Sequence, residues 1–384
     1  MTITSWRATR RTRAADEAEV DALIWAWRQA CEGAGLFQQV DTATGPTLRV
    51  PRLVDITLGP PTVFIVELLA SQIAADVRRV AFRMAGHLGA VALQIEPRGL
   101  RHVRVELLTV DPLAALLPLE LPRLEPGVLL GRGEDGIYVV EDFERGAHTI
   151  VQGVTRSGKS VFTYGVLAQL AGNPRAIVAG CDPTGLLWRP FAGSRHEEWQ
   201  VSGVADPLAH EVLLERLVAE MDERITELPA DRDTIEINDK HPMILVVLEE
   251  LAGLLRCVDG LKTPKDDPGK RLRALIARLL AESAKVGIRV LILVQRAEAA
   301  VIGAFERAMC SLRISFRTDN RASVDLLHPG TPADLADSHT TAQPGIALMS
   351  APGHELARIR APFLGGYAEY ASAVATACLP DVQS

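Results

Sequence analysis

Residues 148–162, HTIVQGVTRSGKSVF, constrain the fold of this chain more than any other stretch. An apolar strand, a Gly-rich loop and the start of a helix follow one another there without a gap. The loop, Gly153 to Ser160, reads GVTRSGKS and fits the phosphate-loop pattern G-x-x-x-x-G-K-[ST] at every position. Because the strand before it and the helix after it supply the required context, we interpret it as a nucleotide site and not as a plain Gly-rich turn.

The chemistry of this loop follows from its residue types. Backbone N–H groups between Gly153 and Gly158 point at a β-phosphate, and the helix N-terminus at Ser160 adds its dipole. The Lys159 ammonium reaches the β- and γ-phosphates, while the Ser160 hydroxyl is a ligand for Mg²⁺. We therefore expect the whole loop to bind nucleotide: Gly153, Val154, Thr155, Arg156, Ser157, Gly158, Lys159 and Ser160.

A second signal of the same site is a buried strand that ends in acids. MILVVLEELAGLL places Glu249 and Glu250 directly after six apolar residues. Glu249 would hold the water shell of Mg²⁺, and Glu250 would orient or deprotonate the attacking water. Two solvated acids at a strand end are the alternative. Gln295, at the end of RVLILVQR, is a weaker candidate, for sensing the γ-phosphate, and Asp182 in AGCDPTG is expected to cap a turn.

From residue 127 onward, short apolar runs alternate with helical stretches. Runs as apolar as HTIVQG, RAIVAGCD, MILVVLEE and IRVLILVQR are expected where helices cover both faces of a parallel sheet. We therefore predict an α/β nucleotide-binding or motor core with a mainly parallel sheet over residues 127–384. A hairpin, VLLGRGEDGIYVV, opens it.

The first third of the chain has a different pattern. TVFIVELL, AVALQIEP and HVRVELLTV are typical of strands and residues 70–89 of a helix, which predicts a small α+β domain over residues 59–126. Its last part, with four prolines, is expected to be a connector. Residues 1–58 are expected to hold an Arg-bearing tail (1–14) and an amphipathic helical segment.

Composition limits the class of protein. Five cysteines lack CxxC spacing, which is typical of reduced thiols in a cytosolic protein. We see no run of 18 apolar residues and no signal-peptide core, so we expect a cytoplasmic protein without a membrane span. The net charge is −7, so nucleic-acid binding would need local basic patches.

Five stretches together resemble the FtsK/SpoIIIE family of hexameric double-stranded DNA translocases. In order they are HTIVQGVTRSGKSVF, CDPTGLLW, ILVVLEELAGLL, AKVGIRVLILVQR and LRISFRTDNRAS. The small domain also looks like the one that precedes the motor in that family. The resemblance covers about residues 60 to 365, and the plasmid-transfer proteins of actinomycete mobile elements are the branch that is most similar.

The resemblance implies a RecA-like motor that forms a homo-oligomeric ring, expected to be a hexamer, around double-stranded DNA. Such a motor uses ATP and Mg²⁺ to pump DNA, here for conjugative transfer. By position, Lys159 and Ser160 match the phosphate and Mg²⁺ residues, Glu250 the catalytic acid and Gln295 the sensor. The DNA-facing basic positions match Arg296 and Arg321, with a plain exposed arginine as the alternative at each. A membrane partner protein is a further expected partner.

Two departures from the family pattern keep other functions open. Glu249 stands where the family has Asp, and the family's trans-acting arginine is absent from SAKVGI, where Lys285 lies one position away. Arg224 and Arg313 are candidate substitutes. One alternative function is a nucleotide-binding regulatory or assembly subunit with weak hydrolysis. Another is a secretion ATPase of the same fold that moves protein.

Overall fold

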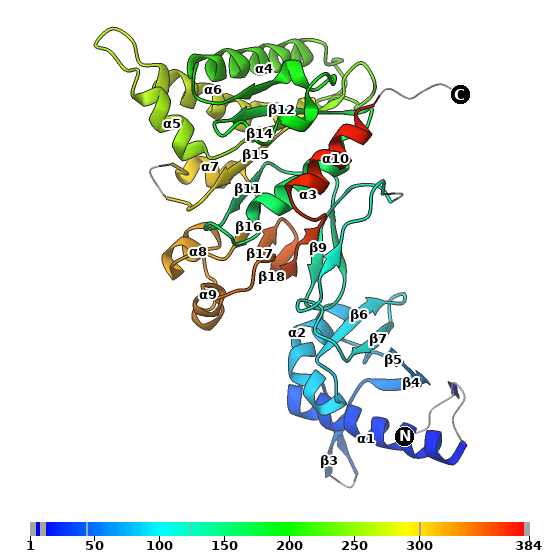
Figure 1. Ribbon diagram of the computed structural model, residues 1–384. Coiled ribbons are helices and arrows are strands. Elements are labelled where there is room, and N and C mark those ends of the chain that lie inside the picture. The colour runs from blue at the N-terminus through cyan, green and yellow to red at the C-terminus, as the bar shows by residue number, and fades with distance from the viewer. Residues whose placement is uncertain (1–4, 8–12, 44, 124, 299–300, 380–384) are drawn as a thin grey trace, which may run out of the picture. The chain divides into compact units, whose positions relative to one another are not determined.

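The computed structural model describes residues 5–7, 13–43, 45–123, 125–298 and 301–379. These residues form two compact units. The first comprises Met1–Ala115 with Arg132–Ile137, and the second comprises Leu116–Gly131 with Tyr138–Ser384 (Figure 1). Most of the Arg-bearing stretch 1–14 lies outside the described residues.

The N-terminal unit packs two helices, α1 (Arg13–Ala34) and α2 (Ala74–Ala85), on a small sheet. A short η1 turn (Gly86–Leu88) follows α2. The strand order is β1-β4-β5-β7-β6, and a separate hairpin pairs β2 with β3. The strands are β1 (Ser5–Arg7), β2 (Gln38–Thr42), β3 (Gly45–Arg49), β4 (Arg52–Thr57), β5 (Thr62–Glu67), β6 (Ala92–Pro97) and β7 (His102–Leu108).

Trp27 of α1 joins the helical segment to this sheet. Its ring is fully buried, lies edge-on to Phe64 of β5 at 5.9 Å between centroids, and its Nε1 donates to the Pro51 carbonyl at 2.8 Å. Strand β4 also pairs with β5 across the expected boundary at residue 58. Residues 1–58 were expected as a segment separate from the α+β domain. That boundary instead falls inside one unit, because the apolar face of α1 is buried against the sheet of that domain.

The C-terminal unit is built on a large sheet with strand order β10-β9-β18-β17-β16-β11-β15-β14-β12-β13. Its strands are β9 (Val128–Gly133), β10 (Tyr138–Glu141), β11 (Thr149–Gln152), β12 (Ala176–Asp182), β13 (Gln200–Ser202), β14 (Met243–Leu248), β15 (Ile288–Val294), β16 (Leu312–Phe316), β17 (Ile346–Ala351) and β18 (His354–Arg360). A separate two-residue pairing joins β8 (Leu117–Pro118), inside the expected connector, to β19 (Pro362–Phe363).

The predicted parallel sheet is only one part of this sheet. The strands from β16 to β13 run parallel to their neighbours. Strands β17 and β18 pair antiparallel with each other, and β17 pairs antiparallel with β16. Two residues connect β17 to β18, a length that permits only antiparallel pairing. The sheet is therefore mixed, and the expectation of a mainly parallel sheet holds for the strands from β16 to the β13 edge alone.

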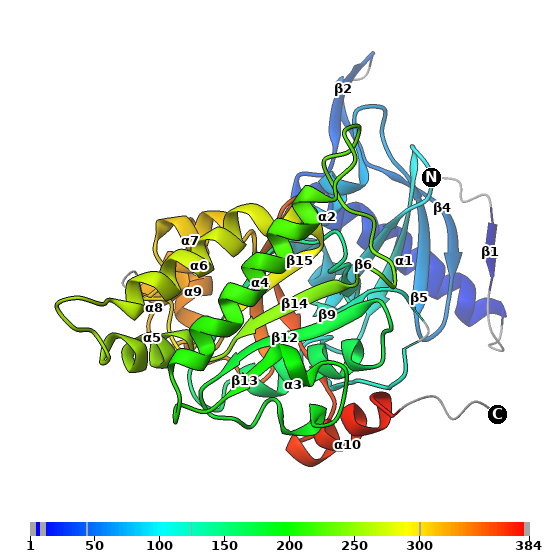
Figure 2. The same ribbon diagram turned by 90° about the horizontal axis from the view of Figure 1, so that it is seen from above.

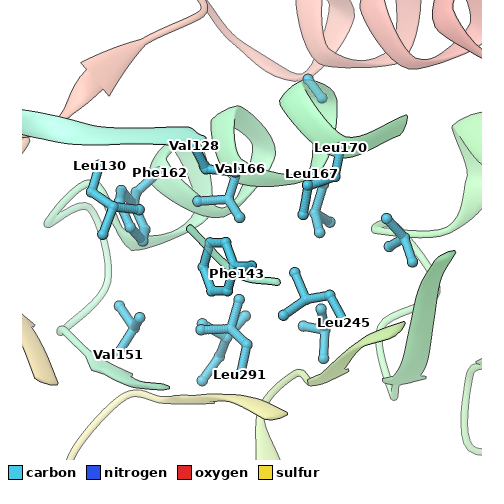
Figure 3. Close-up of a cluster of buried hydrophobic side chains, with 14 of the residues drawn as sticks. Val128, Leu130, Phe143, Val151, Phe162, Val166, Leu167, Leu170, Leu245 and Leu291 are labelled. Carbon is cyan, nitrogen blue, oxygen red and sulfur yellow. The ribbon is translucent and has the colours of Figure 1, made fainter. Parts of the chain in front are cut away.

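Helices cover both faces of the parallel strands, as Figures 1 and 2 show. Strand β14 shows why, since its residues alternate between two apolar cores. Met243, Leu245 and Val247 face a core with α3 (Lys159–Ala171) and α10 (Tyr367–Ala377), part of which Figure 3 shows. The residues between them face α4 (Leu208–Thr226), α5 (Leu251–Asp259) and α6 (Pro268–Glu282). The remaining elements are α7 (Ala304–Met309), α8 (Arg321–Leu327), α9 (Ala333–His339), η2 (Arg189–Phe191), η3 (Glu197–Trp199) and η4 (Ser283–Val286).

Across the residues that the structure describes, every helix is too short or too polar to cross a lipid bilayer.

Candidate nucleotide and DNA site

The phosphate loop emerges between two parallel neighbours. Gln152, the last residue of β11, is in register with Val294 of β15 on one side and Ser315 of β16 on the other. The Gly153 N–H donates to the Val294 carbonyl at 3.2 Å, and the Val154 N–H donates to the Arg317 carbonyl at 3.0 Å. The loop is therefore tied at its start to the carboxyl ends of both flanking strands, which is the edge where ligands bind in such sheets.

Two glycines of the loop are required by close contacts. A Cβ atom on Gly153 would lie 2.5 Å from Ser157 Oγ and 2.8 Å from Phe316 Cβ. Gly158 has φ +109°, and a Cβ there would lie 2.7 Å from the Gly345 nitrogen. Gly345 in turn donates its N–H to the Ser157 carbonyl at 2.9 Å. The loop is thus packed against the segment before β17, and only glycine fits at both positions.

Lys159 and Glu249 face each other at the centre of the site. The Lys159 Nζ atom lies 3.6 Å from Glu249 Oε1, and both side chains are largely buried. Burial raises the pKa of Glu249 above its ordinary value, nearby Asp182 and Glu250 raise it further, and Lys159 opposes them. Glu249, the residue directly after β14, is therefore brought to the phosphate loop, as the sequence predicts.

Glu250 lies one residue beyond this pair in an unusual backbone conformation. Its φ is +46°, and it is the N-cap of α5. In the described part of the chain, Glu250 and Arg156 of the phosphate loop are the two non-glycine residues with positive φ. This conformation costs about 1–2 kcal/mol for a residue with a side chain. Such strain clusters at functional sites, and both strained residues belong to the predicted site.

Gln295 and Ser160 lie at the same edge and are exposed. Gln295 directly follows Val294, whose carbonyl accepts from the first residue of the phosphate loop. Ser160 is the second residue of α3, where backbone N–H groups have no partner within the helix. Both predicted positions are thus next to the loop.

The residues of this site fit a nucleoside polyphosphate with Mg²⁺. Ser157 Oγ is buried without a hydrogen-bond partner among the described residues, and Lys159 Nζ has one carboxylate partner. Phosphate oxygens can accept from both groups. Ser160 and Glu249 are the oxygen donors available to Mg²⁺, which keeps several waters and needs few protein ligands. The described residues contain no cluster of three or more acidic, His or Cys side chains that could hold a metal ion.

Of the two predicted DNA-contacting residues, Arg296 lies on the loop after β15, and Arg321 is the first residue of α8, at the end of the loop after β16. Arg296 follows β15 and forms a close ion pair with Asp319, which lies between β16 and α8. Glu298 is 3.9 Å from the same guanidinium. Arg321 begins α8 and pairs with Asp325 at 3.2 Å. Both arginine side chains are about half exposed.

The two arginine substitutes for the missing trans-acting residue are structural. Arg224 is 2% exposed, and its Nη1 donates to the Pro242 and Val286 carbonyls at 2.9 and 3.1 Å. Arg313 donates to the carbonyls of Cys310 and Leu327. Because these donors are already used inside the unit, neither side chain is available to a neighbouring subunit. Lys285 is exposed and pairs with Asp233.

Asp182 has the hydrogen bonds expected of a turn cap. Its Oδ1 accepts from the Thr184 N–H and hydroxyl at 2.8 and 2.7 Å, and its Oδ2 accepts from the Leu187 N–H at 2.7 Å. The side chain is fully buried.

Sequence reasoning missed three features of the site. Gly345 contacts the loop from a distant segment, and no local signal marks it. Asp319 pairs with Arg296, which only the fold brings together. Gln152 did carry a signal, because a polar residue directly before the phosphate loop breaks an otherwise apolar strand.

Comparison with known proteins gives relatives of one kind. No protein-family model matches the chain. The DNA translocase FtsK of Campylobacter jejuni is 26% identical over 251 residues, covering 62% of this chain and 25% of that protein. FtsK of Brucella melitensis is 25% identical over 341 residues, covering 77% of this chain and 39% of that protein. The chain is similar to the FtsK DNA translocases. The resemblance to the FtsK/SpoIIIE family is thereby confirmed, over well under half the length of these relatives.

Two solved structures share the fold. The pCW3 conjugation coupling protein TcpA, determined with ATPγS, gives a TM-score of 0.55 at 20% identity, covering 91% of this chain and 96% of that one. EssC (ATPases 2 and 3) from Geobacillus thermodenitrificans gives a TM-score of 0.54 at 17% identity, covering 70% and 51%. The α/β fold of P-loop ATPases is therefore shared.

Proposed function

We propose that this chain is the motor subunit of an ATP-driven translocase for double-stranded DNA, acting in conjugative transfer of a mobile element. The observation that carries the proposal is the position of the phosphate loop between two Arg-bearing loops. Strand β11 ends in the phosphate loop, β15 leads to Arg296, and β16 leads to Arg321. Carboxyl ends of parallel strands share one sheet edge, so a nucleotide and a phosphate backbone would bind within the same loop cluster.

The residues of the site have distinct roles in this proposal. Lys159 and the loop N–H groups bind the phosphates of ATP, and Ser160 and Glu249 hold Mg²⁺. Hydrolysis of the bond between the β- and γ-phosphates of ATP would supply the free energy, and Mg²⁺ would neutralise charge on the phosphate oxygens. Glu250 orients and deprotonates the attacking water. Gln295, at the end of the strand beside the loop, senses whether the γ-phosphate is present.

The arginines contact DNA phosphates and carry no base specificity, which suits movement along any sequence. A homo-oligomeric RecA-like ring, a hexamer by family resemblance, would repeat Arg296 and Arg321 around a central duplex. Repetition makes a strong phosphate-tracking surface from a chain with a net charge of −7. The two sequence relatives described above are named as DNA translocases, which supports DNA rather than protein as the substrate.

The test is the steady-state ATPase rate with and without duplex DNA. We expect the rate to rise several-fold with duplex and to be lost in Lys159→Ala and Glu250→Gln. Glu236→Gln, a substitution of a surface acid that is 78% exposed, is the matched control and should behave as the wild type. A low rate that duplex leaves unchanged, with ATP binding intact, would reject the motor and favour a regulatory or protein-moving role.

A further inference from the structure

Gln152 is a buried amide at the junction of the nucleotide and DNA loops. It is the last residue of β11, directly before Gly153, and its side chain is fully buried. Its Oε1 accepts from the Ala297 N–H at 3.0 Å. Its Nε2 donates to the Ser323 carbonyl at 2.9 Å and to Ser315 Oγ at 2.6 Å.

These three bonds reach both Arg-bearing loops. Ala297 directly follows Arg296, and Ser323 lies in the first turn of α8, two residues after Arg321. The orientation of the amide is forced, since a backbone N–H can only donate and a carbonyl can only accept. One side chain therefore joins the start of the phosphate loop to both loops at once, with every polar atom of the amide used.

The bonds continue into a buried chain of polar groups. His328 Nε2 lies 2.9 Å from Ser315 Oγ, and His328 Nδ1 lies 2.9 Å from Ser350 Oγ. Burial lowers the pKa of His328 to about 3, so the ring is neutral at pH 7. Ser315 Oγ accepts from Gln152 and has one proton to give, so the arrangement that satisfies every donor has His328 accepting at Nε2 and donating from Nδ1. This neutral network fixes Ser315, and thus holds Gln152 in one rotamer.

We propose that Gln152 is a positioning residue that transmits the nucleotide state of the phosphate loop to the loops of Arg296 and Arg321. The proposal rests on the proposed function for the assignment of these loops to DNA. A shift of the loop start on nucleotide binding moves the Cα atom of Gln152. The Gln152 amide is bonded to backbone atoms of both loops, and buried hydrogen bonds are costly to break. Movement of Gln152 therefore moves both loops with it.

Two substitutions test these bonds. Gln152→Met removes all three with little change in volume. Gln152→Glu is uncharged in this fully buried position, because burial disfavours the carboxylate, so one oxygen still accepts from the Ala297 N–H and the hydroxyl donates to the Ser323 carbonyl. It is the rescue variant. Gln169→Met is the matched control. Gln169 of α3 also makes three hydrogen bonds, to Leu129 and Gly165, and touches neither Arg-bearing loop.

The experiment is hydrogen exchange by mass spectrometry, with and without ATPγS, on peptides that cover residues 290–298 and 318–327. In the wild type we expect nucleotide to change exchange in both peptides. In Gln152→Met we expect this change to be lost and the Ala297 amide to exchange at least about tenfold faster. ATPγS should still bind, within about threefold of the wild-type Kd. Gln152→Glu, which keeps one bond to each loop, and Gln169→Met should both retain the change in the two peptides.

A nucleotide-dependent change that persists in Gln152→Met, or is absent from the wild type, would overturn the relay. ATPase stimulation by duplex, measured in parallel, separates the two proposals. Wild-type stimulation that survives unchanged in Gln152→Met rejects the relay and leaves the DNA motor standing. Loss of the exchange response in Gln152→Met, with a wild type that duplex does not stimulate, supports the relay and rejects the motor. If Gln152→Met fails to fold, Gln152→Leu, which also removes all three bonds, decides by the same readouts.

Discussion

The Nζ atom of Lys159 lies 3.6 Å from Oε1 of Glu249, so the cation that would bind phosphate is held by the acid that would order Mg²⁺. Both groups are largely buried, and neither has another ionic partner among the described residues within 4 Å. Binding of a nucleotide with Mg²⁺ must replace this ion pair. The phosphate oxygens would then pair with the Lys159 ammonium, and the Glu249 carboxylate would become free to hold the water shell of Mg²⁺.

This exchange predicts a specific effect of Glu249→Gln. Without Mg²⁺, ATPγS should bind at least as tightly as in the wild type, because Lys159 no longer has a competing carboxylate. The gain in ATPγS affinity that Mg²⁺ gives should shrink at least about tenfold, because the Glu249 carboxylate no longer helps to hold Mg²⁺ and its bound waters. Titration calorimetry with EDTA and with Mg²⁺ measures both Kd values. Glu250→Gln is the matched control, since it should keep the Mg²⁺ gain while losing hydrolysis. An equal loss of the gain in both variants would contradict the assignment.

The contact between Gly158 and Gly345 predicts that the phosphate loop tolerates no side chain at residue 158. Gly158→Ala combines a left-handed backbone, which costs about 1–2 kcal/mol, with a Cβ atom 2.7 Å from the Gly345 nitrogen. We expect lower stability and a loss of ATPγS affinity of at least about tenfold. Thermal unfolding and fluorescent-nucleotide titration measure these. Gly86→Ala, where φ is −60° and no atom lies within 4 Å of the new Cβ, should leave both unchanged. Wild-type affinity in Gly158→Ala would mean that the loop re-forms without this contact.

The ion pair between Arg296 and Asp319 predicts opposite effects of two substitutions on DNA binding. Arg296→Ala removes a phosphate contact and should lower the slope of log Kd against log salt by about one. Asp319→Asn frees the guanidinium and should tighten binding a few-fold. Fluorescence anisotropy of a labelled duplex over a salt series measures both. Arg278→Ala is the control, because Arg278 is similarly exposed and ion-paired but lies on α6, away from the loops. A salt slope that stays at the wild-type value in Arg296→Ala would remove this residue from the interface.

How far the sequence predicts this structure depends on the range of the interaction. The phosphate loop and the strand before Glu249 are local patterns, and both lie where they were expected. The antiparallel strands β17 and β18 and the contact from Gly345 were not foreseen, since they depend on pairing with β16 across the fold. Arg224 and Arg313 were candidate substitutes for the trans-acting arginine, and both have their donors bonded inside the unit. A sequence does not show that backbone carbonyls distant along the chain already accept their hydrogen bonds.

Buried neutral histidines make the stability of the C-terminal unit sensitive to acid. Burial lowers the pKa of His148 and of His196 to about 4, and that of His328 to about 3, against 6.5 ordinarily. Below pH 6.5 the unfolded chain therefore binds protons that the folded chain does not, and stability falls as pH decreases toward these values. Three such groups cost up to about 4 kcal/mol per pH unit once the unfolded histidines are charged.

His148→Asn tests this contribution. His148 accepts the Val290 N–H at Nδ1, at 2.9 Å, and an Asn oxygen can occupy the same position without titrating. Urea unfolding at pH 7.5, 6.5, 5.5 and 5.0 gives the free energy of unfolding of variant and wild type. We expect the variant to be less stable than the wild type at pH 7.5, because the Asn side chain is smaller. Below pH 6 we expect the free energy of unfolding of the variant to rise relative to that of the wild type by up to about 1.4 kcal/mol per pH unit. A difference between the two proteins that stays constant from pH 7.5 to 5.0 would show that His148 is charged in the folded chain or does not titrate in the unfolded one.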